Sequence, residues 1–567
     1  MLTARKLISS FFLSNPWLVT AAFLSNIISS LLNIIIPLSI GRFYELVLHD
    51  QSVKGRLFDA LGVSLDSTTA FFQFFLLLIT AKGFMAFADH FLTGVLGERF
   101  SRELRERLFR TQLSHSVTTH NLKPAGKYLL RYSGDLVFIQ RFITQGTIQF
   151  TGDVIFMITS LAVLYSINAT LTLILAGGIL IAILIILLLS RILRTATLNR
   201  RNQRSVLLGF VANRMNAFFT VKSFNREAPE ELQYNKRSGK LYDLGIRYYR
   251  ISSVIQGLLP LLFFGTLAIV LYFISSERVT KPYGIHRSEA LDFVLLFLYM
   301  QAVIRRILKV NVVWQAGSVS FYKLLRILNL PAEAKAQERE LTGIDGRITF
   351  DHVSFQFANA DAPLFNDLTF TLEPHSIIQV KGKQGAGKST LLKIIQGVYA
   401  PVTGKIFLDE YDYAALAPND IRRNVTIVSD ETPLLGSTVF KAISYSRSVE
   451  KKEKAMQALA QVNFRVADSD EENLGFKLDD YGKNLSAGQR RQLMFARAFL
   501  TRKKIILLDD ALDDLDAETK MVIVKRINRL KEKRTIIIAA NNLPPEVRVD
   551  LVIQLGEHQN QKQPVSL

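Results

Sequence analysis

Long apolar stretches without a charged residue dominate the first half of the chain. Three segments contain no Asp, Glu, Lys or Arg, namely residues 7–41, 154–190 and 251–276. Each exceeds the ~20 residues that an apolar α-helix needs to cross a bilayer. The turn-like Asn168-Ala169-Thr170 interrupts the middle segment and predicts two spans joined by a very short hairpin. Weaker apolar stretches at 69–96 and 290–304 bring the expected spans to six, which favours a membrane domain over buried helices of a soluble protein.

The pattern changes in the second half. Residues 331–346 form a polar stretch that is typical of a linker, and a strand pattern begins near Ile348. We therefore expect a transmembrane domain at residues 1–330 and a second domain at 347–557. Residues 558–567 are expected to form a polar, unstructured tail.

Basic residues are distributed unevenly among the connections between the expected spans. The net charge is +20, and the short connections carry few cations, such as Lys54 and Arg56. Two long loops carry many: Arg99, Arg102, Arg105, Arg107, Arg110, Lys123, Lys127 and Arg131 in one, and Arg191, Arg194, Arg200, Arg201, Arg204, Lys222, Lys236, Arg237 and Lys240 in the other. Lys and Arg concentrate on the cytoplasmic side of membrane proteins, so we expect both long loops and both termini in the cytoplasm, at a bacterial inner (plasma) membrane.

The placement of basic residues and the absence of cysteine bear on other kinds of function. No basic stripe is interleaved with aromatic residues as a nucleic-acid-binding groove requires, so no nucleic-acid partner is expected. The chain has no cysteine, which excludes disulfides, thiolate catalysis and cysteine-ligated zinc.

The candidate chemistry begins at residues 382–390, Gly-Lys-Gln-Gly-Ala-Gly-Lys-Ser-Thr. This run follows an apolar strand at 377–380 and precedes an amphipathic helix. Glycines allow successive backbone N–H groups to surround phosphate oxygens, and a helix N-terminus adds a positive dipole end. Lys388 would reach the β- and γ-phosphates and Ser389 would hold Mg²⁺. We therefore expect Gly382, Gly385, Gly387, Lys388, Ser389 and Thr390 to bind ATP.

Further motifs follow in a fixed order. Leu485-Ser486-Ala487-Gly488-Gln489 opens a helix, and the apolar strand at 504–508 ends in Asp509 and Asp510. Asp516 follows, and Phe357 lies upstream. This order and spacing resemble the nucleotide-binding domain of ATP-binding cassette (ABC) proteins.

The resemblance implies roles for these residues. Phe357 would stack on adenine, Asp509 would act on Mg²⁺ at the end of the Walker B strand, and Asp516 would end the D-loop. ABC domains pair head to tail, so Leu485, Ser486, Ala487, Gly488 and Gln489 would serve a partner's phosphate loop in trans. ATP and Mg²⁺ are the expected cofactors.

The first half also resembles this family. Residues 97–105 and 126–135 are similar to the first intracellular loop of ABC exporters, and residues 221–227 to the second. Short transverse helices would lie near 116–121 and 216–224 and dock on the ATPase domains. The expected fold class is therefore a multi-domain membrane protein, with an all-α six-helix transmembrane domain of the ABC exporter type followed by an α/β P-loop NTPase domain.

Three catalytic positions depart from the family pattern. Asp510 replaces the glutamate that polarises water, Asn541 replaces the switch histidine, and Asp430 replaces the Q-loop glutamine. Asp430 could still touch Mg²⁺, so the expected metal set is Ser389, Asp509 and Asp430. Asparagine cannot carry a positive charge or shuttle protons, and a misplaced carboxylate can lower a rate by orders of magnitude.

These features predict ATP-driven export by a dimer in which this chain binds ATP at a slowly hydrolysing site. The preferred partner is a second, different ABC half-transporter, and a homodimer is the alternative. Two other functions stay open: a slow homodimer within a peptide or protein secretion system, and a nucleotide-gated regulatory membrane subunit. The three changes could also be tolerated drift in a working homodimer.

The exported substrate is not identified by the sequence. Lys82 and Asp89 lie in the second expected span, and Arg305, Arg306 and Lys309 lie at or beyond the end of the sixth. Charges inside spans usually face a cavity or a partner. They suggest a basic cavity for an anionic amphiphile or an acidic peptide, and the alternative is that they stabilise helix packing and reach the interface.

Overall fold

The protein divides into two compact units, which are described separately. The computed structural model describes residues 2–48, 67–121, 128, 131–275, 287–333, 341, 343–357, 360–445, 452–556 and 562–564. The first unit comprises Met1–Arg110 and Pro124–Asn329, and the second comprises Thr111–Lys123 and Leu330–Leu567. These units are defined by contacts, and the domain limits expected from the sequence stay predictions. Residues 54 and 56 of a short connection, and residues 123, 126, 127, 129 and 130 of the first long basic loop, lie outside the described residues.

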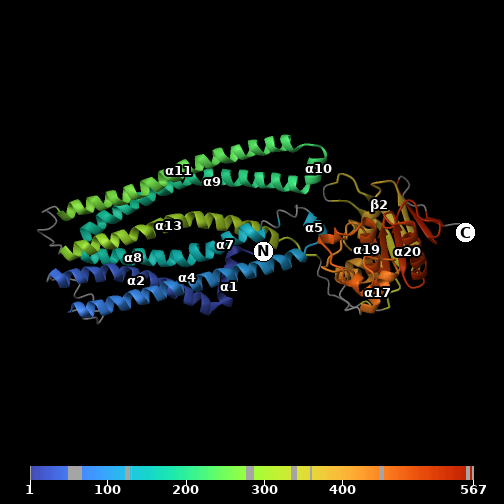
Figure 1. Ribbon diagram of the computed structural model, residues 1–567, viewed down its shortest axis with the longest axis horizontal. Coiled ribbons are helices and arrows are strands. Elements are labelled where there is room, and N and C mark those ends of the chain that lie inside the picture. Colours follow the sequence, from blue (N-terminus) through green and yellow to red (C-terminus); the bar gives the residue numbers. More distant parts are fainter. Residues whose placement is uncertain are drawn as a thin grey trace. The chain divides into compact units, whose positions relative to one another are not determined.

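The first unit consists of helices. They are α1 (Ala4–Ser14), α2 (Pro16–Leu48), α4 (Thr68–Leu113), the π-helical turns η1 (Arg131–Asp135) and η2 (Thr144–Gln149), α7 (Leu136–Ile143), α8 (Phe150–Ile167), α9 (Ala169–Asn216), α10 (Phe218–Ser223), α11 (Glu227–Ser275) and α13 (Arg287–Leu328). Helices α9 and α11 lie side by side along most of their length and are joined at one end through α10 (Figure 1). The short helices expected near 116–121 and 216–224 are present as α5 (Val117–Asn121), which belongs to the second unit, and α10.

Among the described residues, five helical segments are long and apolar enough to cross a membrane. They are Pro16–Val47, Thr68–Leu113, Leu136–Ile167, Ala169–Asn216 and Glu227–Ser275. The sixth expected span lies in α13, which is long but interrupted by Arg305, Arg306 and Lys309. It stays a prediction.

Local sequence explains two helix boundaries. Asn168 has extended backbone angles, and its side chain accepts a hydrogen bond from Leu171 N, so it ends α8 and caps α9. The predicted hairpin is thereby confirmed. The charge-free segment 7–41, in contrast, is not one continuous helix, because Asn15 terminates α1 and Pro16 begins α2. Proline suits the first turn of a helix and disfavours helical geometry in the residue before it.

Two sheets form the second unit. The larger has the strand order β10-β9-β3-β8-β7-β6, in which β9, β3, β8, β7 and β6 are parallel. Its strands are β3 (Ile377–Gly382), β6 (Val425–Val428), β7 (Ile505–Asp509), β8 (Thr535–Ala539), β9 (Leu551–Leu555) and β10 (Lys562–Pro564). The smaller sheet is antiparallel, in the order β2-β1-β4-β5, and contains β1 (Ile348–Phe355), β2 (Phe365–Leu372), β4 (Thr403–Leu408) and β5 (Tyr411–Asp412).

The expected polar tail is partly ordered. β10 pairs antiparallel with β9, so the expectation of an entirely unstructured tail was wrong. The reason is the free edge of β9: an unpaired strand edge accepts a short segment through main-chain hydrogen bonds whatever its side chains are.

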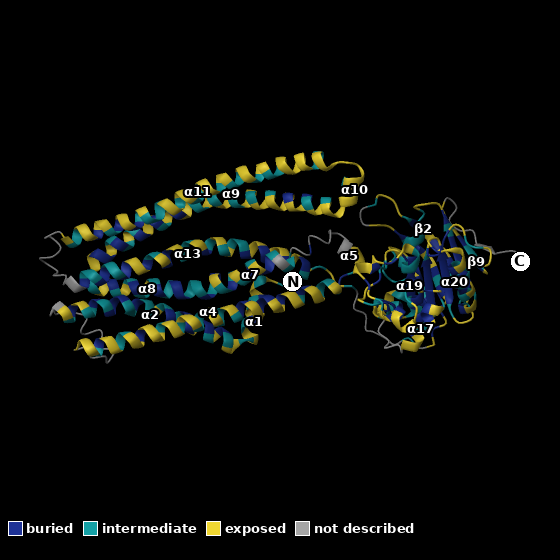
Figure 2. Ribbon diagram, viewed as in Figure 1, coloured by how far each residue is buried: buried dark blue, intermediate teal, exposed yellow. Residues whose placement is uncertain are grey.

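Helices surround the larger sheet. They are α14 (Lys388–Ile395), α15 (Pro418–Asn424), α16 (Val439–Ile443), α17 (Lys452–Ala460), α18 (Asp470–Gly475), α19 (Ala487–Leu500) and α20 (Ala517–Leu530), with single turns η3 (Tyr413–Ala415) and η4 (Asp480–Gly482). The sheet and one side of α19 are buried, whereas α4 and α11 are exposed along much of their length (Figure 2). Exposed apolar helices are expected where lipid or a second protomer covers them.

Several charged side chains inside the first unit have charged or polar partners within the helix bundle. The buried Asp153 on α8, 3% exposed, accepts hydrogen bonds from Arg306 on α13 at 2.6 and 3.1 Å. Asp89 on α4 accepts from Asn26 Nδ2 at 3.1 Å, and Lys82 Nζ donates to Ser29 O at 2.7 Å. Lys82 and Arg306 therefore have partners within the helix bundle, which supports the packing alternative for these two cations.

Arg306 provides a stability test with a neighbouring control. Arg306→Ala removes the cation paired with buried Asp153, and breaking a buried ion pair costs about 3–5 kcal/mol. Since the Arg306 side chain is 42% exposed, we expect the lower end of that range. Arg305 is exposed and forms no hydrogen bond or ion pair with a described residue. Arg305→Ala should therefore lower the free energy of unfolding by less than about 1 kcal/mol. Thermal unfolding of the detergent-purified protein measures both, and equal losses would contradict the pairing role.

Candidate nucleotide-binding site

The candidate site is built where four parallel strands end. β3 leads into the glycine-rich run, β7 ends at Asp509, β8 is followed by Asn541, and β6 is followed by Asp430. Because the strands pair in parallel, their carboxyl ends lie along one edge of the sheet. Ligands of open α/β sheets bind at this edge. Residues separated by more than 150 positions are thereby brought to one edge.

The glycine-rich loop has the geometry of a phosphate cradle. Gly385 and Gly387 adopt positive φ angles of 85° and 91°, a region that other residues rarely enter. A Cβ on Gly387 would lie 2.7 Å from the ring of Phe365. The loop therefore requires glycine at this position, and α14 begins directly after it at Lys388.

The predicted phosphate and metal ligands lie together. Lys388 Nζ donates to Gly382 O at 2.9 Å, which places its charge over the loop. Ser389 Oγ donates to Asp509 Oδ1 at 2.9 Å, joining α14 to the end of β7. Burial raises the pKa of Asp509 above its usual value, and the hydroxyl of Ser389 opposes that shift. A serine hydroxyl bonded to a partly buried carboxylate is an oxygen pair of the type that Mg²⁺ prefers, so these residues fit the ion.

Asp510 and Asn541 lie at the ends of adjacent strands. Asp510 has a positive φ of 44°, and its N–H donates to Ala539 O at 3.0 Å. Asn541 Oδ1 accepts from Gly382 N at 3.1 Å, so the amide contacts the glycine-rich loop directly. Among the described residues no acceptor pairs with Asn541 Nδ2, which leaves this group able to donate to a ligand.

Asp430 lies in the loop after β6, but its carboxylate is paired. Arg491 Nη2 lies 3.0 Å from Asp430 Oδ1 and 2.9 Å from Asp514 Oδ2. The role of Asp430 as a metal ligand stays a prediction. Arg491 was not expected from the sequence, because no local pattern links a residue on α19 to a loop about 60 positions upstream.

The segment 485–489 forms the N-terminus of α19. Ser486 is the N-cap: its Oγ accepts from Gln489 N at 3.1 Å, and Gln489 Oε1 accepts from Ser486 N at 3.0 Å. This capping box fixes the helix start. Ser486 and Ala487 are exposed, whereas Leu485 is buried. An exposed, rigid helix N-terminus is suited to contact an anion on another protomer.

The expected adenine-stacking residue has an aromatic neighbour. Phe357 is partly exposed and packs edge-on against Phe355 and Tyr399. Tyr399 was not expected from the sequence. Asp516 caps α20 by accepting from Thr519 N at 2.9 Å, and this hydrogen bond lowers the pKa of Asp516.

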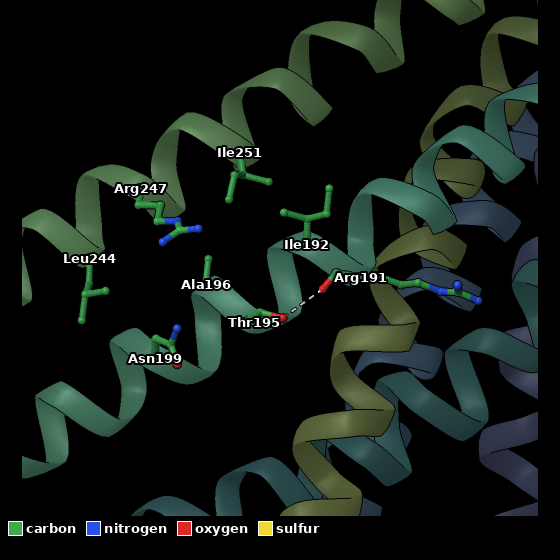
Figure 3. A pocket seen from close by; sticks show the side chains of 8 residues that line it. All are labelled: Arg191, Ile192, Thr195, Ala196, Asn199, Leu244, Arg247 and Ile251. Atoms are coloured by element: carbon green, nitrogen blue, oxygen red, sulfur yellow. Dashed lines mark hydrogen bonds between the residues drawn. The ribbon is translucent and has the colours of Figure 1, made fainter.

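A separate cavity of about 330 Å³ lies between α9 and α11. It is lined by Arg191, Ile192, Thr195, Ala196, Asn199, Leu244, Arg247 and Ile251. Figure 3 shows the Arg247 side chain in the space between the helices, whereas the Arg191 side chain points away from the other lining residues. Arg247 has no interaction with a described residue. The cavity therefore has a lining of apolar and polar side chains, and among the labelled cations it is Arg247 that projects into it.

Comparison with known families gives matches to both halves of the chain. The family model for the ABC transporter transmembrane region matches residues 19–302. The ABC transporter model matches residues 365–513.

Curated relatives match most of the chain. It is 25% identical over 488 residues to an ATP-dependent lipid A-core flippase of Haemophilus influenzae, covering 85% of this chain and 82% of that protein. It is 24% identical over 471 residues to a fatty acid ABC transporter ATP-binding/permease protein of Mycobacterium tuberculosis, covering 81% and 72%. It is 25% identical over 503 residues to the α-hemolysin translocation ATP-binding protein HlyB of Escherichia coli O157:H7, covering 88% and 70%.

A solved structure shares the fold. A bacterial Atm1-family ABC exporter with ATP bound superposes with a TM-score of 0.79 at 18% identity, covering 95% of this chain and 93% of the other. The expected fold class, a helical transmembrane domain followed by a P-loop ATPase domain, is confirmed.

Proposed function

The chain belongs to the ABC transporter family, and from this premise we propose that its own phosphate loop builds the slower site of a dimeric exporter. It is a membrane-embedded ABC exporter half that couples ATP to transport across the membrane. ABC exporters act as dimers. The slow site is the part that goes beyond the family assignment.

The residues at the ends of β7 and β8 carry this proposal. Asp510 withdraws the carboxylate by one carbon relative to glutamate, and its backbone is held by Ala539 O, so little movement can restore the lost reach. Displacements of about 1 Å can cost ~100-fold in rate. Asn541 can hydrogen-bond a phosphate but cannot supply the charge of a histidinium.

Nucleotide binding itself should be retained. Lys388 would contact the phosphates, Thr390 would support them from the first turn of α14, and Ser389 with Asp509 would hold Mg²⁺, with Asp430 as a further candidate ligand. Bound Mg²⁺ supplies neutralisation of phosphate charge. The N-terminus of α19, with Ser486 at its cap, would face the partner's nucleotide.

The partner proposed is a second, different ABC half-transporter that has glutamate and histidine at the corresponding positions. Copurification of such a protein from the native membrane would support this heterodimer. A slow homodimer within a secretion system is the alternative, and the similarity to HlyB favours it. A regulatory subunit without useful turnover is a third possibility.

We further propose that both termini are cytoplasmic and that the membrane is a bacterial inner membrane.

The proposed cargo is an anionic amphiphile or an acidic peptide. Arg305 and Lys309 on α13 are exposed, and neither has an interaction with a described residue. Arg247 lies in the cavity between α9 and α11. The lipid A and fatty acid transporters among the relatives support an amphiphile.

The purified chain should bind Mg-ATP but hydrolyse it slowly. Lys388→Ala should weaken nucleotide binding at least about tenfold, because a charge-assisted hydrogen bond contributes about 1.5–3 kcal/mol. Lys405→Ala, an exposed change on β4, is the matched control and should bind normally. Equilibrium binding of a fluorescent ATP analogue and steady-state ATPase assays measure these effects. Vigorous, cargo-stimulated hydrolysis by a homodimer would exclude the slow site.

Restoring the two family residues should restore turnover. Asp510→Glu combined with Asn541→His should raise the ATPase rate about tenfold or more, since the carboxylate regains its reach and the imidazole supplies charge. The same pair in a Lys388→Ala background should remain inactive. If the double variant hydrolyses ATP no faster than the unmodified protein, these positions do not limit the rate.

Cargo recognition can be tested on α13. Arg305→Gln with Lys309→Gln should reduce stimulation of ATPase activity by anionic lipids several-fold without altering ATP affinity. Lys323→Gln, a comparable exposed change further along α13, should leave stimulation intact. Unchanged stimulation in the double variant, or stronger stimulation by cationic compounds, would rule out anionic cargo at this position.

A further inference from the structure

The loop after β6 is held by charged contacts on both sides. On one side, Lys393 Nζ lies 2.7 Å from Glu431 Oε2. Lys393 belongs to α14, five positions after Lys388, so the loop is connected to the helix that begins the phosphate site. The position of Glu431 therefore depends on the position of α14.

On the other side, the loop is connected to α19. Arg491, 3% exposed, extends one nitrogen, Nη2, toward Asp430 and Asp514 at 3.0 and 2.9 Å. Asp514 lies in the segment after β7, and its backbone packs closely against Gly488 of α19. A Cβ added to Gly488 would lie only 3.2 Å from the Asp514 backbone oxygen. Arg491, Asp430 and Asp514 thus join the loop after β6, the loop after β7 and helix α19, which Ser486 caps.

A second arginine of α19 reinforces the connection. Arg497 donates to Thr432 O at 2.8 Å and to Pro433 O at 3.2 Å. These backbone contacts fix the far end of the loop independently of Asp430. Consequently, substitutions at Asp430 or Arg491 should alter the position of the loop's first residues without detaching the whole loop.

The buried guanidinium needs both carboxylates. A charged group this deeply buried is strongly destabilising unless it is paired, and Arg491 Nη1 is itself buried without a hydrogen-bond partner among the described residues. The Asp430 side chain, in contrast, is 81% exposed. The contact therefore joins an exposed residue, Asp430, to a residue fixed in the core, Arg491. This arrangement would let a movement of the loop after β6 be passed on to helix α19.

We propose that Arg491 is a positioning residue that couples occupancy of this chain's phosphate loop to the placement of residues 485–489 against the partner's nucleotide. The coupling runs from Lys393 through Glu431 and Asp430 to Arg491 and Asp514. It rests on the proposed head-to-tail dimer. Asp430 thereby acts through Arg491, whether or not its carboxylate also approaches Mg²⁺.

The test is a double-mutant cycle in the full-length transporter, reconstituted in its native oligomeric form. Arg491→Gln and Asp430→Asn are measured singly and together for kcat and KM of ATP hydrolysis. Arg491→Gln should lower kcat several-fold with less than twofold change in KM, because it leaves the phosphate-binding and candidate metal-binding residues untouched. Asp430→Asn should lower kcat by a similar factor. The double variant should be no slower than the slower single variant, since residues that act as a unit are not additive.

Arg491→Lys and Arg502→Gln serve as controls. The lysine retains the charge and should recover part of kcat. Arg502 is exposed just beyond α19, has no interaction with a described residue, and its change should alter nothing. Thermal unfolding distinguishes misfolding from miscoupling: a variant with an unchanged midpoint and reduced kcat supports positioning.

A second measurement does not depend on turnover. Hydrogen–deuterium exchange of residues 485–489 should slow when a non-hydrolysable ATP analogue with Mg²⁺ is added to the unmodified transporter. In Arg491→Gln this response should be lost while the affinity for the analogue is retained. Multiplicative effects in the cycle, or a full exchange response in Arg491→Gln, would overturn the coupling. If the unmodified transporter hydrolyses ATP rapidly and the double-mutant cycle is still non-additive, the slow site is refuted. The coupling through Arg491 is then retained.

Discussion

The parallel pairing of β9, β3, β8, β7 and β6 is the constraint on which the nucleotide site depends. Parallel ladders align the carboxyl ends of strands that are distant in sequence. The glycine-rich loop, Asp509, Asn541 and Asp430 each follow one of these ends. A shift of one residue in any strand would move its terminal group along the edge and reverse the faces of its side chains.

Polar side chains at the candidate site connect its secondary-structure elements to one another. The Ser389–Asp509 hydrogen bond joins α14 to the end of β7, and the Asn541–Gly382 hydrogen bond joins the ends of the neighbouring strands β8 and β3. Arg491 joins two loops to one helix. The departures at 430, 510 and 541 therefore stand in a well-formed site and not in a collapsed one. This supports altered catalysis with retained binding as the interpretation of these three residues.

The membrane unit follows a different rule. In an apolar environment the backbone must satisfy its own hydrogen bonds, which favours long helices. Charged side chains are tolerated there when they form hydrogen bonds or ion pairs. Asp153 with Arg306 and Asn26 with Asp89 satisfy that condition. Gly152 contributes by allowing close approach, because a Cβ there would lie 1.9 Å from Asn26 Oδ1. Arg305, Lys309 and Arg247 are different, since none has a partner among the described residues, and they remain the candidates for contact with cargo or lipid.

The sequence by itself determined the features that are encoded locally. Apolar length predicted the membrane helices, Asn168 predicted the short turn between α8 and α9, and the run 382–390 predicted the phosphate loop, because each depends on residues within a few turns of one another. It did not reveal the break at Asn15, the pairing of β10, or the partners of Lys82 and Arg306. Only the tertiary structure decided that Asp430 meets Arg491 and that Asn541 meets Gly382, since these contacts depend on the strand order and on helix packing. Such long-range contacts leave no periodic trace in a single sequence.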